Sequence, residues 1–431
     1  MTTAWGDTTM SKQQLNRRTF LAAGTAGAAA LGASAVVARG ADDANSRLSI
    51  GVIGTGGRGG NLMSVIAALA EGHAAQITAL CDVWQPNLDQ AAHRVRGAFG
   101  KEPRRFTRFQ ELLARADVDA VVIATADFSH GPILVAALEA GKDVYVEKPM
   151  CLDVADANRA LDLARERKRV VQVGTQFRSH SGYAAAADVL SSGVLGEVSR
   201  ISASANFNHA RWARPFDDCR EADVDWDAYL LDLPKRPFDP KQLRRWHLYR
   251  EFTNGLSGLW MSHYVDAVHK LTGAEYPSRA AALGGAYVWK DGREHCDTFH
   301  ALIEYPDGFL FDWGMGLGNA SGNGFVVYGT NGQLEVSKNY IDPDSLMLSP
   351  AGGAESTSVE ARKIEPESMP YADVLKVHLD NWLTCLRSRK RPNADIQFGH
   401  QHAVATIMTA AALHSGQRQT YDPQRRAIEA G

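Results

Sequence analysis

Short, continuous apolar runs alternate with stretches of helical periodicity in the first third of the chain. Residues 48–53 form such a run, and residues 61–70 then place Leu62, Val65 and Ile66 on one helical face. A short apolar run indicates a buried strand, and the second spacing indicates a helix. Repeated alternation of this kind predicts a parallel, doubly wound α/β sheet. It continues through further strand-like and helical stretches at 76–81, 120–124, 132–140 and 143–146.

The second half of the chain has a period of two instead. Residues 298–305 alternate apolar with more polar side chains, and residues 199–209 do the same with Ile201, Ala203 and Ala205 on one face. This alternation indicates strands that have one buried face. The second half therefore differs in architecture from the first.

A glycine-rich turn joins the first predicted strand to the first predicted helix. Gly54, Gly56 and Gly59 form a G-x-G-x-x-G pattern that also contains Gly57 and Arg58. Glycines here let the backbone approach a pyrophosphate, whose charge is stabilised by the helix N-terminus. Because the pattern lies between a strand and a helix, it predicts a dinucleotide site.

The residue that ends the second predicted strand bears on the choice of cofactor. Asp82 lies roughly 20 residues beyond the glycine turn, where an acid binds the ribose hydroxyls. Since a carboxylate disfavours a 2′-phosphate, NAD is preferred and NADP is the weaker alternative. A phosphate contact from Arg58 keeps that alternative open.

Composition limits the classes of function. The 431 residues carry a net charge of −3, with 45% apolar and 22% charged residues, the balance of an ordinary globular protein. This charge gives no support to nucleic-acid binding. The five cysteines lack the spacing of a zinc site, so we expect buried thiols and no metal, with one disulfide left open.

The first 41 residues have the layout of an export signal. Arg17 and Arg18 precede an uncharged stretch at 20–38, and residues 33–35 offer a cleavage site. Paired arginines here indicate the twin-arginine route, which carries folded proteins. A membrane anchor is the alternative, although the stretch is only weakly hydrophobic. We expect a periplasmic or otherwise exported protein with no stable membrane span after cleavage.

The sequence Glu147-Lys148-Pro149 follows the predicted strand at 143–146. Together with the glycine turn and residues 125–130, it resembles the family of glucose–fructose oxidoreductase, inositol dehydrogenase and MocA. The similarity extends through most of the remaining chain, at 172–178, 225–227, Trp246, Gly308, 329–332 and 381–389.

The resemblance implies a domain organisation. After the signal segment at 1–41, a Rossmann NAD-binding domain is expected at 42–170. A substrate-binding and oligomerisation α+β domain is expected at 171–431, built on a large, mostly antiparallel open sheet. In one arrangement the late helix at 373–389 packs back on the Rossmann domain. A homodimer or homotetramer is expected.

The resemblance also implies roles for individual residues. Lys148 would act on the substrate hydroxyl as a base or proton relay, for which burial or nearby positive charge must lower its pKa. Glu147 would position the nicotinamide or its ribose. The residues expected to bind the cofactor are Gly54, Gly56, Gly57, Arg58, Gly59, Asp82, Thr125, Asp127, His130, Glu147, Lys148 and Gln176.

One part of the resemblance is incomplete. His263 and Asp266 match a family helix that places a histidine near the substrate, but the aspartate usual four residues before that histidine is Leu259 here. Residues four apart share one face of an α-helix, so the expected proton relay lacks its acid. His263 is a catalytic candidate, and a buried structural histidine is the alternative.

Aromatic and polar residues between 206 and 264 are candidates for a sugar pocket. Tryptophans can stack on sugar faces, whereas arginine and histidine can bind hydroxyls or an acidic group. Trp226, Arg211, Arg214 and Arg250 belong to this wider set. The residues we predict to bind substrate are Arg178, Trp212, Trp246, Trp260, His247 and Asp266.

Three functions follow. The first is an exported oxidoreductase that acts on a sugar, glycoside or polyol with a tightly bound cofactor. The second is a redox-neutral NAD-dependent glycosidase that oxidises, eliminates, hydrates and reduces, although that branch has a tyrosine where this chain has Trp260. The third is a non-catalytic binding relative, which the presence of Lys148 and His263 argues against.

Overall fold

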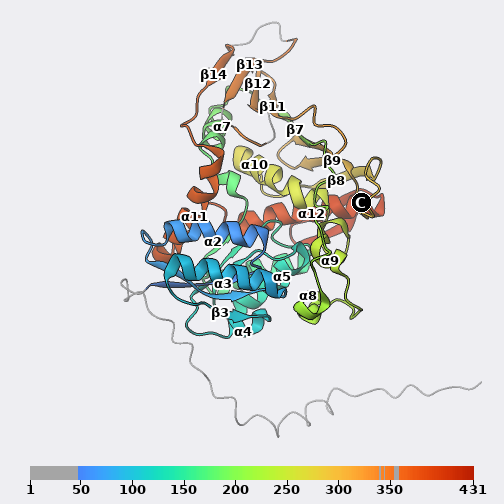
Figure 1. Cartoon of the computed structure of the whole chain (residues 1–431). Coiled ribbons are helices and arrows are strands. Elements are labelled where there is room, and N and C mark those ends of the chain that lie inside the picture. Colours follow the sequence, from blue (N-terminus) through green and yellow to red (C-terminus); the bar gives the residue numbers. More distant parts are fainter. Residues whose placement is uncertain (1–46, 339–340, 344, 354–358) are drawn as a thin grey trace, which may run out of the picture. The chain divides into compact units, whose positions relative to one another are not determined.

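The first of the two sheets in the described part of the chain is parallel and has six strands in the order β3-β2-β1-β4-β5-β6. Figure 1 draws this sheet in blue to turquoise. The computed structural model describes residues 47–338, 341–343, 345–353 and 359–431. This sheet confirms the predicted doubly wound architecture. Its strands are β1 (Leu48–Ile53), β2 (Ala75–Cys81), β3 (Arg104–Phe106), β4 (Ala120–Ile123), β5 (Asp143–Val146) and β6 (Val171–Val173).

Helices cover both faces of this sheet because its strands are apolar on both sides. Ile50 and Val52 of β1 pack on one face, against α2, α3 and α11, whereas Ile53 packs with α4, α5, α6 and α12. Strands buried on both faces read as continuous apolar runs, which is the observed pattern. The helices are α2 (Gly57–Leu69), α3 (Gln85–Phe99), α4 (Phe109–Leu113), α5 (Asp127–Glu139), α6 (Val154–Glu166), α11 (Tyr371–Ser388) and α12 (Ile396–Ser415).

One helix begins earlier than its apolar spacing predicts. The spacing places a helix at 132–140, but α5 starts at Asp127. Its first turn contains Asp127, Ser129 and His130, which are buried although they are polar. Hydrophobic periodicity cannot detect a helical turn that buries polar groups, so the expected boundary was wrong.

The second sheet has ten strands in the order β14-β13-β12-β11-β7-β10-β9-β8-β15-β16. The pair β10 and β7 is parallel, whereas the other pairs with a defined register are antiparallel, which confirms the mostly antiparallel prediction. The strands are β7 (Val198–Asn206), β8 (Arg279–Gly285), β9 (Thr298–Tyr305), β10 (Phe309–Gly316), β11 (Gly324–Gly329), β12 (Gly332–Ser337), β13 (Leu346–Pro350), β14 (Arg362–Ile364), β15 (Gln419–Asp422) and β16 (Ala427–Ala430).

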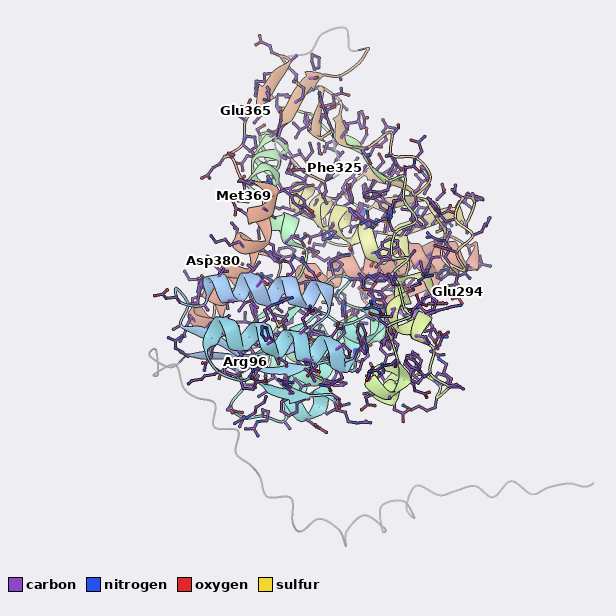
Figure 2. All side chains as sticks on the ribbon, in the orientation of Figure 1. Arg96, Glu294, Phe325, Glu365, Met369 and Asp380 are labelled. Atoms are coloured by element: carbon purple, nitrogen blue, oxygen red, sulfur yellow. The ribbon has the colours of Figure 1, made fainter. Side chains whose placement is uncertain are left out.

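One face of the second sheet is covered by helices. Phe299, Ala301, Ile303 and Tyr305 of β9 are buried, in agreement with the predicted alternation. Phe325 of β11, labelled in Figure 2, is fully buried, and its ring lies 6.0 Å from that of Tyr264. The elements that contribute to this core are α7 (Ser181–Ser191), α10 (Ser262–Thr272) and α12.

The structure tests the prediction about the cysteines but not the prediction of a targeting segment. All five cysteines are free and buried, so the disulfide that the sequence left open does not form. The proposed export segment lies outside the described residues. Within the part of the chain that is described, no helix is long and apolar enough to cross a membrane.

Candidate active site

A pocket lies at the carboxyl ends of β1, β2 and β4. The strand order changes direction here, because β2 and β3 lie on one side of β1 and β4, β5 and β6 lie on the other. Crevices at such reversal points are the usual ligand sites of open α/β sheets. One wall comes from the first sheet and the other from the middle of the chain. The lining includes Gly54, Gly56, Gly57, Arg58, Asp82, Trp84, Asn87, Thr125, Ser129, Arg214, Tyr229, Leu231, Arg244, Trp246 and His247.

The glycine turn has the geometry that a dinucleotide requires. Gly54 has φ +85, and a Cβ added there would lie 2.6 Å from the backbone of Ala124. A Cβ on Gly59 would lie 1.9 Å from the carbonyl oxygen of Gly54, whereas one on Gly57 would meet nothing within 4 Å. Gly54 and Gly59 therefore allow the turn to close, and Gly57 leaves room beside the pocket.

The N-terminus of α2 is available to an anion. Its N-cap residue, Gly56, offers no side-chain hydrogen bond, and the first turn contains no acidic residue. The first amides of a helix have no intrahelical partners and carry partial positive charge. This turn and its open space fit the pyrophosphate of a dinucleotide.

Asp82 lies in the pocket but already has protein partners. Its Oδ2 accepts from the amide of Thr55 at 2.7 Å and from Thr55 Oγ1 at 2.9 Å, and its Oδ1 accepts from the amide of Trp84 at 3.0 Å. Burial raises its pKa, and these hydrogen bonds oppose the shift. The carboxyl is therefore held rigidly at the end of β2, where a ribose is expected.

Glu147 is held beside the glycine turn rather than in the pocket lining. Its Oε1 accepts from Arg58 Nε at 2.7 Å. A Cβ on Gly174 would lie 2.7 Å from Glu147 Oε1, so only glycine leaves room for this carboxylate. The pair links the end of β5 to the N-terminus of α2.

Lys148 lies where the end of β5 meets the second half of the chain. Its Nζ donates to the carbonyl oxygen of Leu259 at 2.5 Å, and the Lys148–Pro149 peptide bond is cis. Burial lowers the pKa of Lys148, while the nearby charges of Asp127 and Glu147 act in the opposite direction. The ammonium is therefore held by a neutral oxygen in a desolvated place.

Asp127 and His130 brace the same corner from α5. Asp127 Oδ2 accepts from Thr253 Oγ1 at 2.7 Å, and burial raises the pKa of this carboxyl to about 6. His130 Nδ1 is 2.8 Å from the carbonyl oxygen of Pro149, and Nε2 is 3.2 Å from that of Thr125. His130 thus holds the loop that carries Lys148, Asp127 holds Thr253, and neither side chain lines the pocket.

The helix that carries His263 starts with a different winding from the expected one. Residues Ser257–Met261 form a π-helical turn (η4), and α10 follows from Ser262. The expectation that positions 259 and 263 share an α-helical face was therefore wrong. Leu259 instead presents its main-chain oxygen to Lys148. The residue at the position where the family aspartate was expected thus contacts Lys148, through its main-chain carbonyl.

His263 is a buried, neutral imidazole. Its side chain lies edge-on to Phe177, with ring centroids 5.2 Å apart. Burial lowers its pKa well below the usual value, and the charge of Lys148 adds to the shift. Its Nδ1 is buried without a hydrogen-bond partner among the described residues. A buried nitrogen of this kind fits a contact to a ligand.

The aromatic candidates fall into two groups. Trp246 and His247 line the pocket, and Trp212 stacks on His247 at 5.5 Å. Trp260 lies against Phe207 at 4.9 Å, away from the pocket lining. Trp226 is buried in an apolar cluster, which accounts for it without a ligand.

Three other predicted residues lie inside the protein. Arg178 Nε donates to Asp266 Oδ1 at 3.0 Å, and both side chains are almost fully buried. Gln176 is in the short 3₁₀ turn η1 (Gln176–Ser179) before α7, and its Oε1 has no partner within the described part of the chain. The structure does not bring these side chains into the pocket lining.

Sequence reasoning missed several contributors. Tyr229 and Arg244 line the pocket, and Thr253 holds Asp127. These residues come from the long connection between β7 and β8 of the second sheet, which has no clear periodicity. Its density of aromatic and arginine side chains was the one available signal.

Comparisons with known proteins agree with this geometry. Residues 48–175 match the model of an oxidoreductase family with an NAD-binding Rossmann fold, and residues 229–420 match the C-terminal alpha/beta domain of an oxidoreductase family. An uncharacterized oxidoreductase of Synechocystis is 30% identical over 317 residues, covering 68% of this chain and 76% of the relative.

Other relatives match over a shorter part of the chain or at a lower sequence identity. A dTDP-3,4-didehydro-2,6-dideoxy-alpha-D-glucose 3-reductase of Streptomyces violaceoruber is 42% identical over 130 residues, which is 30% of this chain and 36% of that protein. The chain thus spans less than half of the first curated relatives it matches. The structure of a levoglucosan dehydrogenase with NADH and levoglucosan is similar in fold, with a TM-score of 0.65, 17% identity and coverage of 89% and 99%.

Substitutions at two glycines of the turn should affect stability and ligand binding differently. We expect Gly59→Ala to lower the free energy of unfolding by about 1–3 kcal/mol because its methyl group clashes with the Gly54 carbonyl. A methyl group at position 57 would meet open space, so Gly57→Ala should leave the free energy of unfolding unchanged. It should lower the affinity for the dinucleotide because the methyl group takes up room beside the pocket. Denaturant unfolding and NADH titration of both variants test this, and equal stability losses would contradict it.

Asp127 should make the free energy of unfolding depend on pH, and the direction of its pKa shift fixes the sign. Because its pKa is raised to about 6 in the folded state, from about 3.9 when unfolded, wild-type stability should fall as pH rises through this window. Asp127→Asn should therefore gain on the order of 2–3 kcal/mol relative to wild type between pH 4 and pH 8.

The matched control for that measurement is Asp117→Asn. The hydrogen bond from Arg115 lowers the pKa of Asp117 to about 2, so this variant should lose stability at neutral pH and converge with wild type in acid. Denaturant unfolding at several pH values measures both. A flat difference for Asp127→Asn would show that its carboxyl is not held protonated.

Proposed function

The chain belongs to the glucose–fructose oxidoreductase, inositol dehydrogenase and MocA family of oxidoreductases, and on this premise we propose that it transfers hydride between a carbohydrate and a tightly bound NAD. The observation that carries the proposal is the position of Lys148. Its Nζ is held by the Leu259 carbonyl at the junction of the dinucleotide-binding sheet with the helix that bears His263. A sugar hydroxyl next to the cofactor would meet both groups.

Several groups are suited to hold the cofactor. The turn at Gly56 and Gly57 and the N-terminus of α2 fit the pyrophosphate, and Asp82 fits the ribose hydroxyls and favours NAD over NADP. Arg58 and Glu147 brace the turn from the side of β5. The nicotinamide, when bound, supplies the acceptor or donor of hydride.

Lys148 would manage the proton of the substrate hydroxyl. Because burial lowers its pKa, a larger fraction of the amine is neutral and able to accept that proton. Its hydrogen bond to Leu259 fixes the position of Nζ. His263 stays neutral and offers its free Nδ1 to orient the sugar.

We further propose that the protein is exported by the twin-arginine route. The paired arginines at 17 and 18 and the uncharged stretch after them support this. Free dinucleotide is scarce outside the cytoplasm, so a retained cofactor must be restored during each cycle. Either a second sugar reoxidises it, or one substrate is oxidised and reduced again.

A homo-oligomer is the proposed assembly. Leu283 is 80% exposed and Leu302 is 50% exposed, on the neighbouring strands β8 and β9. Their side chains lie on the sheet face opposite the helices. Apolar residues that gather on an open sheet support a contact with another subunit.

A redox-neutral glycosidase is the second candidate. Two buried imidazoles, His247 and His263, each have an Nδ1 without a hydrogen-bond partner among the described residues, and the charge of Lys148 helps to lower the pKa of both. Oxidation alone needs one group to take the hydroxyl proton, whereas elimination and hydration each move another proton. This surplus of bases is the observation that favours the alternative.

An assay without added nucleotide separates these functions. Purified holoprotein is given free sugars and chromogenic glycosides while aglycone release and reduced nicotinamide are recorded together. Reduction that stops at one equivalent per subunit until a second sugar is added is the expected result. Many turnovers of aglycone with no reduced nicotinamide would establish the glycosidase instead.

Lys148→Ala tests the assigned base. We expect turnover to fall by about 10²- to 10⁴-fold because proton transfer loses its acceptor. The content of bound dinucleotide should stay at the wild-type level, as Lys148 does not line the pocket. Lys376→Ala, on an exposed position of α11, is the control and should keep full activity. Near-normal turnover of Lys148→Ala would reject the role.

A further inference from the structure

The middle of the chain covers the dinucleotide pocket. Residues 214–253, called the cover below, include α8 (Trp226–Leu230), α9 (Pro240–Arg244) and the short turn η3 (Trp246–Leu248). Tyr229, Leu231 and Trp246 of the cover line the pocket together with residues of the glycine turn. A ligand that binds along the turn would therefore also contact the cover.

The cover is fixed to the loop that follows β2. Val224 forms an antiparallel bridge with Trp84, and the amide of Asp225 donates to the Val83 carbonyl at 2.8 Å. The carboxylate of Asp225 is 3.2 Å from Arg108 Nη2. Three contacts thus join the cover to the edge of the pocket that holds Asp82.

The cover is also fixed to the start of α5. The amide of Phe128 donates to the Phe252 carbonyl at 3.1 Å, and the Phe128 ring lies 5.1 Å from that of Phe252 and 5.4 Å from that of Tyr229. The buried residues of this contact form one apolar cluster, made of Ala126, Trp226, Tyr229, Leu230 and Phe252. Lifting the cover would expose this cluster to water, which is costly.

The cover brings positive charge into the pocket. Arg214 and Arg244 both line it, and the guanidinium of Arg244 lies 4.4 Å over the ring of Trp84. Arg244 also reaches Asp218 at 3.7 Å, but no carboxylate pairs with Arg214 among the residues that the structure describes. Burial lowers the pKa of Arg214, and repulsion from Arg244 adds to the effect. An anion bound between Arg214 and Arg244 would offset both the burial of the Arg214 charge and the repulsion between the two guanidinium groups.

His247 adds a polar contact from the same segment. It lines the pocket, is 7% exposed, and its Nδ1 has no hydrogen-bond partner in the described parts of the chain. A buried nitrogen without a hydrogen-bond partner is unfavourable unless a ligand satisfies it. The enclosed space, the two arginines and this imidazole all fit a phosphate-containing ligand with hydroxyl groups.

We propose that the cover retains the dinucleotide, and that Arg214 and Arg244 bind its phosphates from the side opposite the helix α2 N-terminus. The cofactor then leaves only when the cover undocks from Trp84 and Phe128. This inference rests on the proposed function in one respect, that the bound ligand is a dinucleotide. It assigns retention to a segment outside the Rossmann sheet.

The charge contribution is tested by the release of NADH. Holoprotein loaded with NADH is chased with excess NAD, and the loss of bound-NADH fluorescence gives the dissociation rate. Arg214→Gln with Arg244→Gln should release NADH at least about tenfold faster, because charge-assisted hydrogen bonds are lost. Arg220→Gln is the control, since Arg220 lies on the cover but is 76% exposed and pairs with Asp223.

The packing contribution needs its own variant. Phe252→Leu leaves both arginines in place but removes the ring contacts with Phe128 and Tyr229, so NADH should again dissociate faster than from wild type. Raising the salt concentration should accelerate release from wild type and have less effect on the double arginine variant. This comparison holds even if a variant is less stable.

Three outcomes are decisive. Wild-type release rates in both the arginine and the Phe252 variants would overturn the cover. Sugar oxidation by a protein that exchanges NADH freely would also overturn it; the proposed hydride transfer would stand, but its tightly bound cofactor would not. Slow, variant-sensitive release of NADH from a protein that oxidises no carbohydrate would support the cover and reject the activity.

Discussion

Burying the ammonium of Lys148 is the constraint on which the site depends. A buried charge costs several kcal/mol unless polar groups surround it. Here the carbonyl of Leu259 accepts from Nζ, while Asp127 and Glu147 supply negative charge nearby. Those carboxylates need partners in turn, and Thr253 and Arg58 provide them. The corner therefore works only if β5, α5, α2 and the segment before α10 meet there.

This dependence separates what the sequence can predict from what it cannot. Strand β5 and strand β9 were predicted at 143–146 and 298–305, because burial on one or both faces leaves a local pattern. The glycine turn was predictable for the same reason, because the close packing of the turn itself requires glycine at positions 54 and 59. Family resemblance added the second sheet.

The contacts between distant segments left no such pattern. Apolar periodicity does not show that Asp127 starts a helix, because the turn buries polar groups. The bridge between Trp84 and Val224 joins residues far apart in the chain. The contact of Leu259 with Lys148 is made by a main-chain oxygen, so the side chain at position 259 carries no information about it.

The partner of Lys148 at this position is an uncharged main-chain carbonyl, and this has a chemical consequence. An aspartate beside Lys148 would favour its charged form and raise its pKa, whereas a carbonyl oxygen holds Nζ without adding a charge. The lysine therefore keeps more of the neutral amine that burial favours. His263 stays neutral because burial disfavours its charged form and the charge of Lys148 further lowers its pKa. For the proposed hydride transfer, Lys148 would then supply an acceptor for the hydroxyl proton, and because a catalyst lowers the barrier in both directions, the same amine would return that proton when the hydride comes back.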